Sequence, residues 1–344
     1  MTFRFGLIGA GMVAGAFHRA AAASDTVAIA GVYARRQAAR DTVAAEQGCK
    51  TYDSLDALIA DAPDAVIATT PPNARAQIVA ACAAAGVPLL TEKPLERDSA
   101  SAEILIAQMG DVPFGVVLQH RMRPASQAAR RLIADGVVGA VRMLRVDVPW
   151  WRDPGYYAAP GRGTFARDGG GVMLTQAIHA LDLGLWLAGD AVASVQGQTS
   201  RAVHDLEAED TAVAGMTFAG GATGVFTATT AAFPGHPETI EVTCDAATLR
   251  LASGQLTVLH RDGRVDHVGE KGGTGSGADP MAFPHDWHQA VMEDFASAVR
   301  QGRPPAIPAQ AAMAVHRTID AIARSARDGT RVTLPAPTDP QAGT

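Results

Sequence analysis

Residues 9–14 of the chain read Gly9-Ala10-Gly11-Met12-Val13-Ala14, which is the pattern G-x-G-x-x-A. They stand between an apolar segment, Phe3–Ile8, that we expect to form a strand and an alanine-rich segment, Met12–Ala23, that we expect to form a helix. In such a turn the first glycine permits a tight bend, and the second lets a pyrophosphate approach the backbone. The small third residue lets the helix pack closely on the strand. Phosphates bound there meet unpaired N–H groups at the positive end of the helix.

A glycine pattern of this kind also occurs in ordinary turns. Here a second apolar segment, Val27–Tyr33, follows, so strand, turn, helix and second strand fall in register within about 30 residues, as a dinucleotide-binding unit requires. We therefore predict that a dinucleotide binds at this turn, in contact with Gly9, Gly11, Met12 and Val13.

The residues after the second strand, Arg35 and Arg36, bear on which dinucleotide binds. NAD-selective sites usually place an aspartate or glutamate about 20 residues beyond the glycines, where it binds the ribose 2′-hydroxyl. This chain has no acid there, and arginine offers the planar, charged donor that a 2′-phosphate needs. We therefore expect NADP to be favoured, with NAD possible, and Tyr33 or Arg35 could also stack on the adenine. The alternative is that both arginines only begin a solvated helix.

The first third of the chain alternates short apolar segments with alanine-rich ones. Most of the short segments are apolar throughout, as strands buried on both faces of a parallel sheet are. The expected strands are Phe3–Ile8, Val27–Tyr33, Ala65–Thr69, Pro88–Leu90 and Phe114–Leu118, and the expected helices are Met12–Ala23, Arg36–Gln47, Ala74–Ala85 and Ser99–Met109. This alternation implies right-handed crossovers, so we predict an α/β fold that begins with a doubly wound parallel sheet.

Beyond Pro124 strand-like segments follow at short spacing, separated by turn signals such as Ala219-Gly220-Gly221. We expect one mostly antiparallel sheet in this half. Its expected strands are Val141–Val148, Ala193–Thr199, Thr211–Phe218, Thr223–Thr230, Thr239–Cys244, Thr248–Leu251 and Leu256–His260, and the expected helices are Ala125–Asp135, Val172–Leu187, Asp286–Arg300 and Ala309–Arg327. We predict domains over residues 1–121 and 122–335, with a mobile loop at Gly269–Gly277 and a disordered tail at 336–344.

Composition narrows the class of protein. A chain of 344 residues is too long for one ordinary core, and 47% hydrophobic and 19% charged residues are typical of a globular protein. The net charge of −6, without a basic run, argues against nucleic acid and anionic membrane as partners. No segment reaches the roughly 18–20 apolar residues of a membrane span. The three cysteines, Cys49, Cys82 and Cys244, are far apart and suit a reducing compartment, so we expect a cytosolic protein.

Three further motifs stand out. They are Thr69-Thr70-Pro71-Pro72-Asn73, Thr91-Glu92-Lys93-Pro94 and Gly169-Gly170-Gly171-Val172-Met173-Leu174-Thr175-Gln176-Ala177-Ile178-His179. With the glycine turn, they make the chain resemble, over nearly its whole length, the glucose-fructose oxidoreductase / inositol dehydrogenase / rhizopine-catabolism (Gfo/Idh/MocA) family of NAD(P)-dependent dehydrogenases. The resemblance implies an N-terminal Rossmann domain and a C-terminal α/β domain for substrate binding. The large, mostly antiparallel open sheet of that second domain often mediates oligomerisation, so a homodimer or homotetramer is expected.

The resemblance also implies site residues. Lys93 matches the active-site lysine of the family and His179 its acid/base histidine. Positions that match the family's cofactor site are Thr70, Pro71, Asn73, Glu92 and Arg121. The chemistry is reasonable in itself, because hydride removal from a secondary alcohol requires uptake of the hydroxyl proton, and a histidine, with an ordinary pKa of about 6.5, accepts a proton near neutrality. A lysine ammonium stabilises the developing alkoxide.

One position departs from the family pattern. Many members place an aspartate four residues before the histidine, one turn away on the same helix face, whereas this chain has Thr175. Threonine carries no proton at neutral pH, so Thr175 can only hydrogen-bond substrate or ribose. The proton role then falls on His179, with Lys93 as the second candidate. Asp182 could orient the histidine ring or form a structural pair.

Aromatic residues make up only 5% of the chain, yet Trp150, Trp151, Tyr156 and Tyr157 lie within eight residues of one another. Aromatic faces suit a hydroxyl-rich ring, and arginines suit a carboxylate or phosphate. We therefore expect the substrate to contact Trp151, Arg152, Tyr156, Arg162 and Thr175. The alternative is that these side chains close a seam between domains or subunits. His285-Asp286-Trp287-His288 resembles a metal cluster, but we expect Asp286 to cap a helix and assign no metal.

The leading hypothesis is an NADP-preferring dehydrogenase or reductase acting on a secondary hydroxyl or carbonyl of a sugar, polyol or sugar acid. Two alternatives follow from the same resemblance. Some relatives are NAD-dependent glycosidases that oxidise their substrate transiently, and a few act as dinucleotide-sensing regulators without catalysis.

Overall fold

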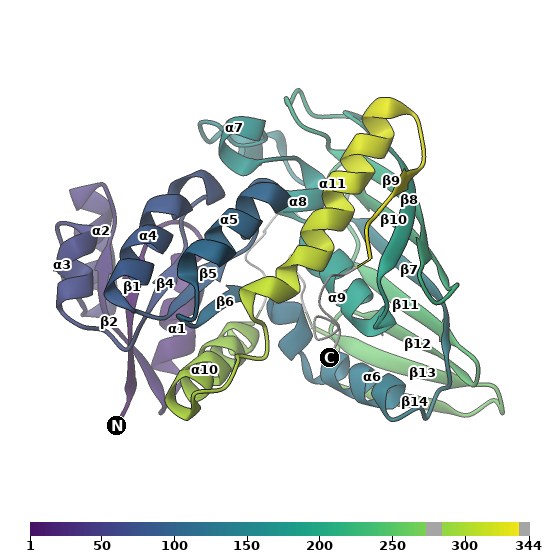
Figure 1. The fold of residues 1–344 in the computed structure, drawn as a ribbon, viewed down its shortest axis with the longest axis horizontal. Helices are drawn as coiled ribbons and strands as arrows, with labels where there is room; N and C mark the ends of the chain where they lie inside the picture. Colours follow the sequence, from purple (N-terminus) through teal and green to yellow (C-terminus); the bar gives the residue numbers. More distant parts are fainter. Residues whose placement is uncertain (273–283, 337–344) are drawn as a thin grey trace. The chain divides into compact units, whose positions relative to one another are not determined.

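The computed structural model describes residues 1–272 and 284–336, which divide into two units (Figure 1). The first comprises Met1–Gln119 and Pro284–Ala312, and the second the described parts of residues 120–283 and 313–344. The predicted loop beyond Gly272 and the predicted tail beyond Ala336 lie outside the described residues.

Six parallel strands form the sheet of the first unit, in the order β3-β2-β1-β4-β5-β6. They are β1 (Phe3–Ile8), β2 (Val27–Tyr33), β3 (Lys50–Tyr52), β4 (Ala65–Ala68), β5 (Leu89–Glu92) and β6 (Phe114–Val117). Every residue of β4, β5 and β6 is buried, as expected of strands covered on both faces. This doubly wound order confirms the predicted Rossmann-type sheet. Ile8 pairs with both Tyr33 and Ala68, so β1, β2 and β4 end together at one edge of the sheet.

Helices cover this sheet. They are α1 (Ala14–Ala22), α2 (Gln37–Gln47), α3 (Leu55–Ala60), α4 (Arg75–Ala85), α5 (Ser99–Met109) and α10 (Asp286–Gln301), with short 3-10 turns η1 (Pro72–Ala74) and η4 (Ala309–Ala312). The domain prediction assigned residues 286–301 to the second half of the chain, but α10 packs on α1, β2 and β6. Its Phe295 is fully buried, and its ring centroid lies 6.4 Å from that of Phe5. Burial of this apolar face joins residues 284–312 to the first unit.

Two elements of the first unit escaped the sequence analysis. Strand β3 has only three residues, too few for an alternation to be recognised. Helix α3 is also short, but its start carried a usable signal. The Ser54 side chain accepts a hydrogen bond from the backbone N–H of Ala57 (3.0 Å), which is the geometry of an N-cap.

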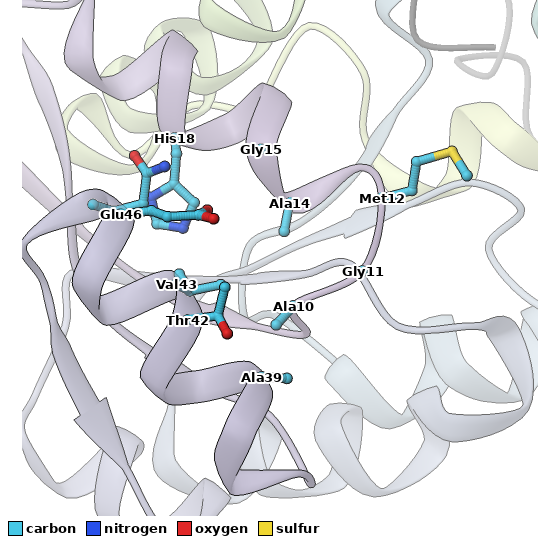
Figure 2. A pocket seen from close by; sticks show the side chains of 11 residues that line it. Ala10, Gly11, Met12, Ala14, Gly15, His18, Ala39, Thr42, Val43 and Glu46 are labelled. Carbon is cyan, nitrogen blue, oxygen red and sulfur yellow. The ribbon is translucent and has the colours of Figure 1, made fainter. Parts of the chain in front are cut away.

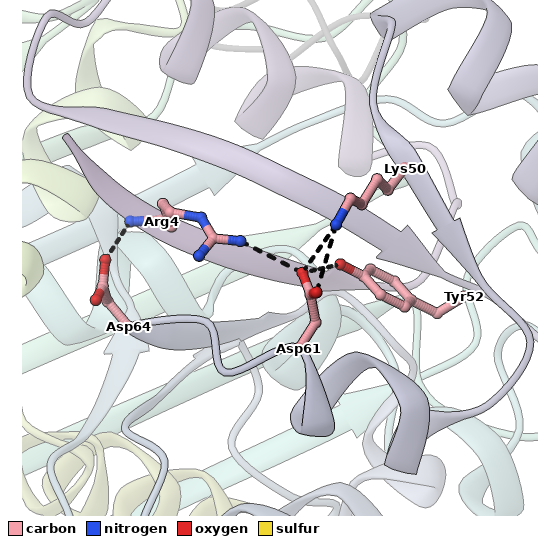
Figure 3. A network of polar contacts seen from close by, with 5 residues as sticks. All are labelled: Arg4, Lys50, Tyr52, Asp61 and Asp64. Carbon is pink, nitrogen blue, oxygen red and sulfur yellow. Dashed lines mark hydrogen bonds and ion pairs between the residues drawn. The ribbon is translucent and has the colours of Figure 1, made fainter.

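A polar network stabilises the edge of this sheet where β1 and β4 begin (Figure 3). The Asp61 carboxylate accepts hydrogen bonds from the Tyr52 hydroxyl (2.6 Å) and from Arg4 (3.3 Å), and Lys50 lies 3.4 Å away. Asp64 accepts the backbone N–H of Arg4 (2.7 Å). Burial and the Asp61 contact raise the pKa of Tyr52 to about 12. Because the glycine turn follows the opposite end of β1, this network is structural.

Nine strands form the sheet of the second unit, in the order β14-β13-β12-β11-β7-β10-β9-β8-β15. They are β7 (Val141–Pro149), β8 (Val192–Ser200), β9 (Thr211–Phe218), β10 (Thr223–Thr229), β11 (Thr239–Cys244), β12 (Ala247–Ala252), β13 (Gln255–His260), β14 (Val265–Val268) and β15 (Val332–Thr333). Neighbouring strands are antiparallel except β7 and β10, which run parallel. This confirms the prediction of a mostly antiparallel sheet, although the short strands β14 and β15 were not predicted.

Helices pack on this sheet and leave its other face exposed. They are α6 (Pro124–Ala134), α7 (Phe165–Asp168), α8 (Val172–Thr175), α9 (Ile178–Ala188) and α11 (Met313–Asp328). In the second unit of Figure 1, α6 contacts β12 and β13, α9 contacts β7 and β11, and α11 contacts β8. Alternation along β9 shows the two faces, since Ala212 and Ala214 are buried and Val213 is 47% exposed.

Two predicted helices are interrupted. The helix expected over Val172–Leu187 ends at Thr175 and resumes at Ile178. The bend between the segments Phe165–Thr175 and Ile178–Ala188 is 54°. The N–H groups of Gln176 (3.2 Å) and Ala177 (2.8 Å) both bond to the Val172 carbonyl, which closes α8 with a wide turn. The helix expected over Ala309–Arg327 begins as η4 and becomes α-helical at Met313.

Within the described residues, no single helix is long and apolar enough to cross a membrane. One bent pair, Phe165–Thr175 with Ile178–Ala188, meets the length and composition criteria together, and its second helix is buried almost throughout.

Candidate functional site

The glycine turn of the first unit has the geometry that its sequence predicted. Gly9 has φ +108°, and a Cβ there would lie 2.5 Å from the Thr69 hydroxyl oxygen, so glycine is required by conformation and by space. At Gly11 a Cβ would meet nothing within 4 Å, so its backbone faces open space. Helix α1 begins just beyond, and Val13 at its N-cap provides no side-chain hydrogen bond to the first N–H groups. The turn therefore offers free space and helix N–H donors to phosphates.

A cavity of about 400 Å³ opens at this turn, between α1 and α2 (Figure 2). Its lining residues are Ala10, Gly11, Met12, Ala14, Gly15, His18, Ala39, Thr42, Val43, Glu46 and Gln47. Most of them are small, so few side-chain atoms fill the space between the two helices. His18 was not predicted as part of this region. Burial lowers the pKa of His18, and the nearby Glu46 carboxylate opposes that shift. The turn and cavity together fit a phosphate-containing ligand such as a dinucleotide.

Arginines surround the start of α2. Arg35 and Arg36 are exposed, and neither guanidinium forms an ion pair or hydrogen bond with another described residue. Arg40 is different, because it is buried and donates to the Ala34 carbonyl (2.7 Å) and to Asp53 (2.9 Å). Arg40 thereby fixes the backbone just before Arg35. Arg40 was not among the predicted site residues, because its spacing of four residues from Arg36 is not a distinctive pattern.

Lys93 lies at the same edge of the sheet as the glycine turn. Ala68 pairs with Thr91 in the neighbouring strand, so Lys93 follows the carboxyl end of β5, beside the end of β4. Its backbone N–H donates to the buried Glu92 carboxylate (3.0 Å). A second carboxylate oxygen of Glu92 lies 3.7 Å from the ring of buried His288 on α10.

The loops at this edge are held by Arg75, which the sequence analysis did not select. Its guanidinium is buried and donates to the carbonyls of Thr70 (2.9 Å), Leu95 (3.2 Å) and Lys93 (3.5 Å). Burial lowers the pKa of Arg75 to about 10, opposed by the carboxylates of Glu92 and Glu96. The other predicted residues here, Pro71 and Asn73, belong to the turn that begins α4, and the Asn73 side chain is exposed.

In the second unit, the triple-glycine segment is clamped by Glu209. Its carboxylate accepts the backbone N–H groups of Gly171 (3.1 Å) and Met173 (3.2 Å), and its carbonyl accepts that of Val172 (2.9 Å). A Cβ at Gly171 would lie 1.7 Å from the Glu209 carbonyl oxygen, so no side chain fits there. Burial raises the pKa of Glu209, and its backbone hydrogen bonds oppose the shift. These contacts determine where α8 begins.

Thr175 ends α8 and His179 lies in the first turn of α9, so the expected shared helix face is wrong. The Thr175 hydroxyl donates to the Gly171 carbonyl (2.6 Å) and also contacts the Gln176 side chain. His179 is buried, and its ring stacks on that of His120 with centroids 4.8 Å apart.

Arg121 and Asp182 form a buried ion pair. Two guanidinium nitrogens of Arg121 donate to the two carboxylate oxygens of Asp182, at 2.8 and 2.6 Å. Asp182 was expected either to orient the histidine ring or to form a structural pair. The structure shows the structural pair, with Arg121 as its partner. The Arg121 guanidinium also lies over the ring of Trp186. Its part in cofactor binding stays a prediction.

The aromatic residues predicted to contact substrate gather in the second unit. Two guanidinium groups lie close to the Tyr156 ring, that of Arg162 at 4.1 Å and that of Arg152 at 5.6 Å from its centroid. Arg152 is buried, and its guanidinium also lies 4.9 Å from the Trp150 ring. Trp151 packs against the exposed Phe233, with ring centroids 5.5 Å apart.

No group of three or more His, Cys, Asp or Glu side chains suited to a metal ion is found in residues 1–272 and 284–336. Asp286 is the first residue of α10 and His285 its N-cap, which provides no side-chain hydrogen bond. The prediction that Asp286 caps this helix is therefore wrong by one residue.

Two family models match the chain. Residues 3–111 match the oxidoreductase family with an NAD-binding Rossmann fold, and residues 126–250 match the GFO/IDH/MocA C-terminal domain.

Similar proteins cover most of the chain. It is 29% identical over 324 residues to the rhizopine catabolism protein MocA of Rhizobium meliloti, with 91% of each chain covered. It is 27% identical over 250 residues to inositol 2-dehydrogenase of Rhizobium meliloti strain 1021, covering 70% of this chain and 73% of that one. The solved structure of the WlbA dehydrogenase from Bordetella pertussis, in complex with NADH and UDP-GlcNAcA, is 27% identical. The TM-score between the two structures is 0.82, and the match covers 98% of this chain and 100% of that one.

Proposed function

The chain belongs to the Gfo/Idh/MocA family of oxidoreductases, and from that premise we propose that it transfers hydride between NADP and a secondary hydroxyl or carbonyl of a sugar, polyol or sugar acid. The observation that carries the proposal is the position of Lys93 at the sheet edge where the glycine turn lies. Ligands of doubly wound sheets bind at the carboxyl ends of the strands. A bound nicotinamide would accept or supply the hydride.

Lys93 and His179 are the proposed catalytic residues. Lys93 places a cation where negative charge develops on the substrate oxygen during oxidation. His179 takes the hydroxyl proton in that direction and returns it in the other. Arg75 and Glu92 fix the backbone on both sides of Lys93, which supports a precise position for its side chain. Pro71, Asn73 and Thr70 are proposed to contact the cofactor near the same edge.

The preference for NADP rests on Arg35 and Arg36, whose guanidinium groups are exposed at the start of α2. We expect the double variant Arg35→Ala/Arg36→Ala to raise the Kd of NADP about 10- to 100-fold, the size expected for losing one charge-assisted hydrogen bond. The Kd of NAD should change little, because NAD has no 2′-phosphate. Titration of each dinucleotide against protein fluorescence measures both constants.

Arg131→Ala is the matched control for that experiment, because Arg131 is an exposed arginine on α6, in the second unit. It should leave both constants unchanged. Equal weakening of NADP and NAD in the double variant would contradict the proposed 2′-phosphate contact.

The substrate class rests on the Arg152–Tyr156–Arg162 arrangement and on the relatives. Two guanidinium groups close to one tyrosine ring suit a hydroxyl-rich molecule that carries a carboxylate or phosphate. One relative is named for inositol, and the WlbA structure contains a nucleotide sugar acid. Trp151 and Thr175 complete the proposed substrate contacts.

A panel of sugars, polyols, sugar acids and their keto forms tests the proposed reaction. We expect at least one member to change the nicotinamide absorbance, faster with NADP than with NAD. Absence of turnover across the panel with both cofactors would argue against this substrate class.

We further propose that the chain forms a homodimer or homotetramer, which the exposed face of the nine-stranded sheet supports. We also propose a cytosolic location, for which the separated cysteines are the support.

A further inference from the structure

In the second unit, His179 belongs to a series of buried side chains that contact one another in turn. The His179 ring stacks on the ring of His120, with an interplanar angle of 25°. His120 also contacts a guanidinium nitrogen of Arg123 through Nε2. A second guanidinium nitrogen of Arg123 donates to Glu238 (3.0 Å). All four residues are less than one-tenth exposed, and Glu238 lies 115 positions from Arg123 in sequence.

The contact between Arg123 and His120 determines where the His120 proton is. A guanidinium has only donors, so it must donate to Nε2, and Nε2 must present its lone pair. The proton of His120 is therefore on Nδ1, and the ring is neutral. A second proton would put a cation directly against the guanidinium, in a buried place where like charges repel strongly.

Glu238 balances the charge of Arg123. Burial lowers the pKa of Arg123, while the contact with Glu238 opposes that shift. The remaining ion pair on these segments, Arg121 with Asp182, is balanced within itself. His120 thus presents an uncharged ring face to His179.

We propose that Arg123 and Glu238 hold His120 as a neutral ring, and that His120 is a positioning residue that orients His179 and stabilises its protonated form. This proposal rests on the proposed function. During oxidation the substrate carbon loses hydride to the bound dinucleotide, its O–H proton passes to His179, and the C–O single bond becomes a carbonyl. His179 then carries a positive charge, which the face of a neutral aromatic ring attracts. A protonated His120 would repel the positive charge on His179, so His179 would take up the substrate proton less readily.

The first test measures the His120 tautomer and needs no substrate. In protein labelled with ¹⁵N-histidine, we expect the His120 Nε2 resonance at the shift of an unprotonated ring nitrogen and Nδ1 at that of a protonated one. His120→Gln identifies the signals. Protonation of Nε2, or of both nitrogens, would overturn the proposal whether or not a substrate has been found.

The second test separates position from stability. His120→Gln keeps an acceptor for Arg123 but removes the ring, and we expect it to lower kcat about tenfold, the size of one cation–π contact. The KM and the Kd of the dinucleotide should stay unchanged, and the solvent deuterium isotope effect on kcat should rise because proton transfer becomes slower. Histidine at another place serves as control: His267→Gln, on exposed strand β14, should change none of these values.

Charge variants complete the design. Arg123→Lys keeps a cationic donor and should retain most of kcat. Arg123→Met/Glu238→Gln removes both charges without leaving either one buried alone, and should reduce kcat with the raised isotope effect. Wild-type kcat in both His120→Gln and the double variant would overturn the proposal. If the double variant does not fold, the kinetics of His120→Gln and the tautomer of His120 in the wild type still test the proposal.

Discussion

His179→Ala is expected to lower kcat about 10²- to 10⁴-fold, the usual contribution of a positioned general acid or base. Lys93→Ala is expected to lower kcat about 10²- to 10³-fold, as loss of one group that stabilises an oxyanion does. Both variants should bind the dinucleotide like the wild type, because the glycine turn and the start of α1 are unchanged. Steady-state kinetics on the substrate found in the panel, with fluorescence titration of NADP, measures both quantities.

Matched controls are available for both residues. Lys50 lies in the polar network around Asp61, and His267 lies on exposed strand β14. Lys50→Ala and His267→Ala should keep full turnover. Wild-type turnover in Lys93→Ala or His179→Ala would exclude that residue from catalysis. A parallel loss of NADP binding would instead indicate a damaged cofactor site.

Arg121→Met is expected to cost about 3–5 kcal/mol of unfolding free energy, because it leaves the Asp182 carboxylate buried without its cation. Asp182 has a side chain only 1% exposed, and burial already opposes its ionisation by raising its pKa. Arg121→Met/Asp182→Leu removes both charges and should recover most of the loss, since apolar residues often replace a buried ion pair at little cost. Urea unfolding followed by circular dichroism measures these differences.

Arg142→Met provides the surface comparison. Arg142 pairs with Asp245 at 2.7 Å, but the two side chains are 63% and 46% exposed. Solvent screens such a pair, so its loss should produce no resolvable shift of the unfolding midpoint. An equal shift in Arg121→Met and Arg142→Met would show that burial of the Arg121 pair contributes nothing.

Much of the first unit could be predicted because its signals are local. Apolar strands β1 and β2 agree with the predicted bounds, and the glycine turn lies between β1 and α1 as expected. The requirement for Gly9 follows in part from its own φ angle, which is local, whereas the contact with Thr69 that also excludes a side chain is a tertiary one. Family motifs then gave Lys93 and His179 as candidate catalytic residues, which remain a prediction. Short elements such as β3 were not predicted, because three residues are too few for an alternation of apolar and polar side chains to be recognised.

Other features depend on residues far apart in the chain. Helix α10 joined the first unit because its apolar face, including Phe295, is buried there. The break before His179 could not be read from the sequence, because the segment from Val172 to Leu187 contains no proline or glycine at the break.

The sequence by itself determined the two kinds of sheet, the phosphate-binding turn and the residue types available for hydride chemistry, because backbone conformation and strand periodicity depend on neighbouring residues. Only the tertiary structure decided which buried charges are partners. Arg75 donates to three backbone carbonyls, and Arg121 forms an ion pair with Asp182. Arg123 contacts both His120 and Glu238. A buried charge must find a partner wherever packing brings one within reach, and sequence spacing does not specify that place.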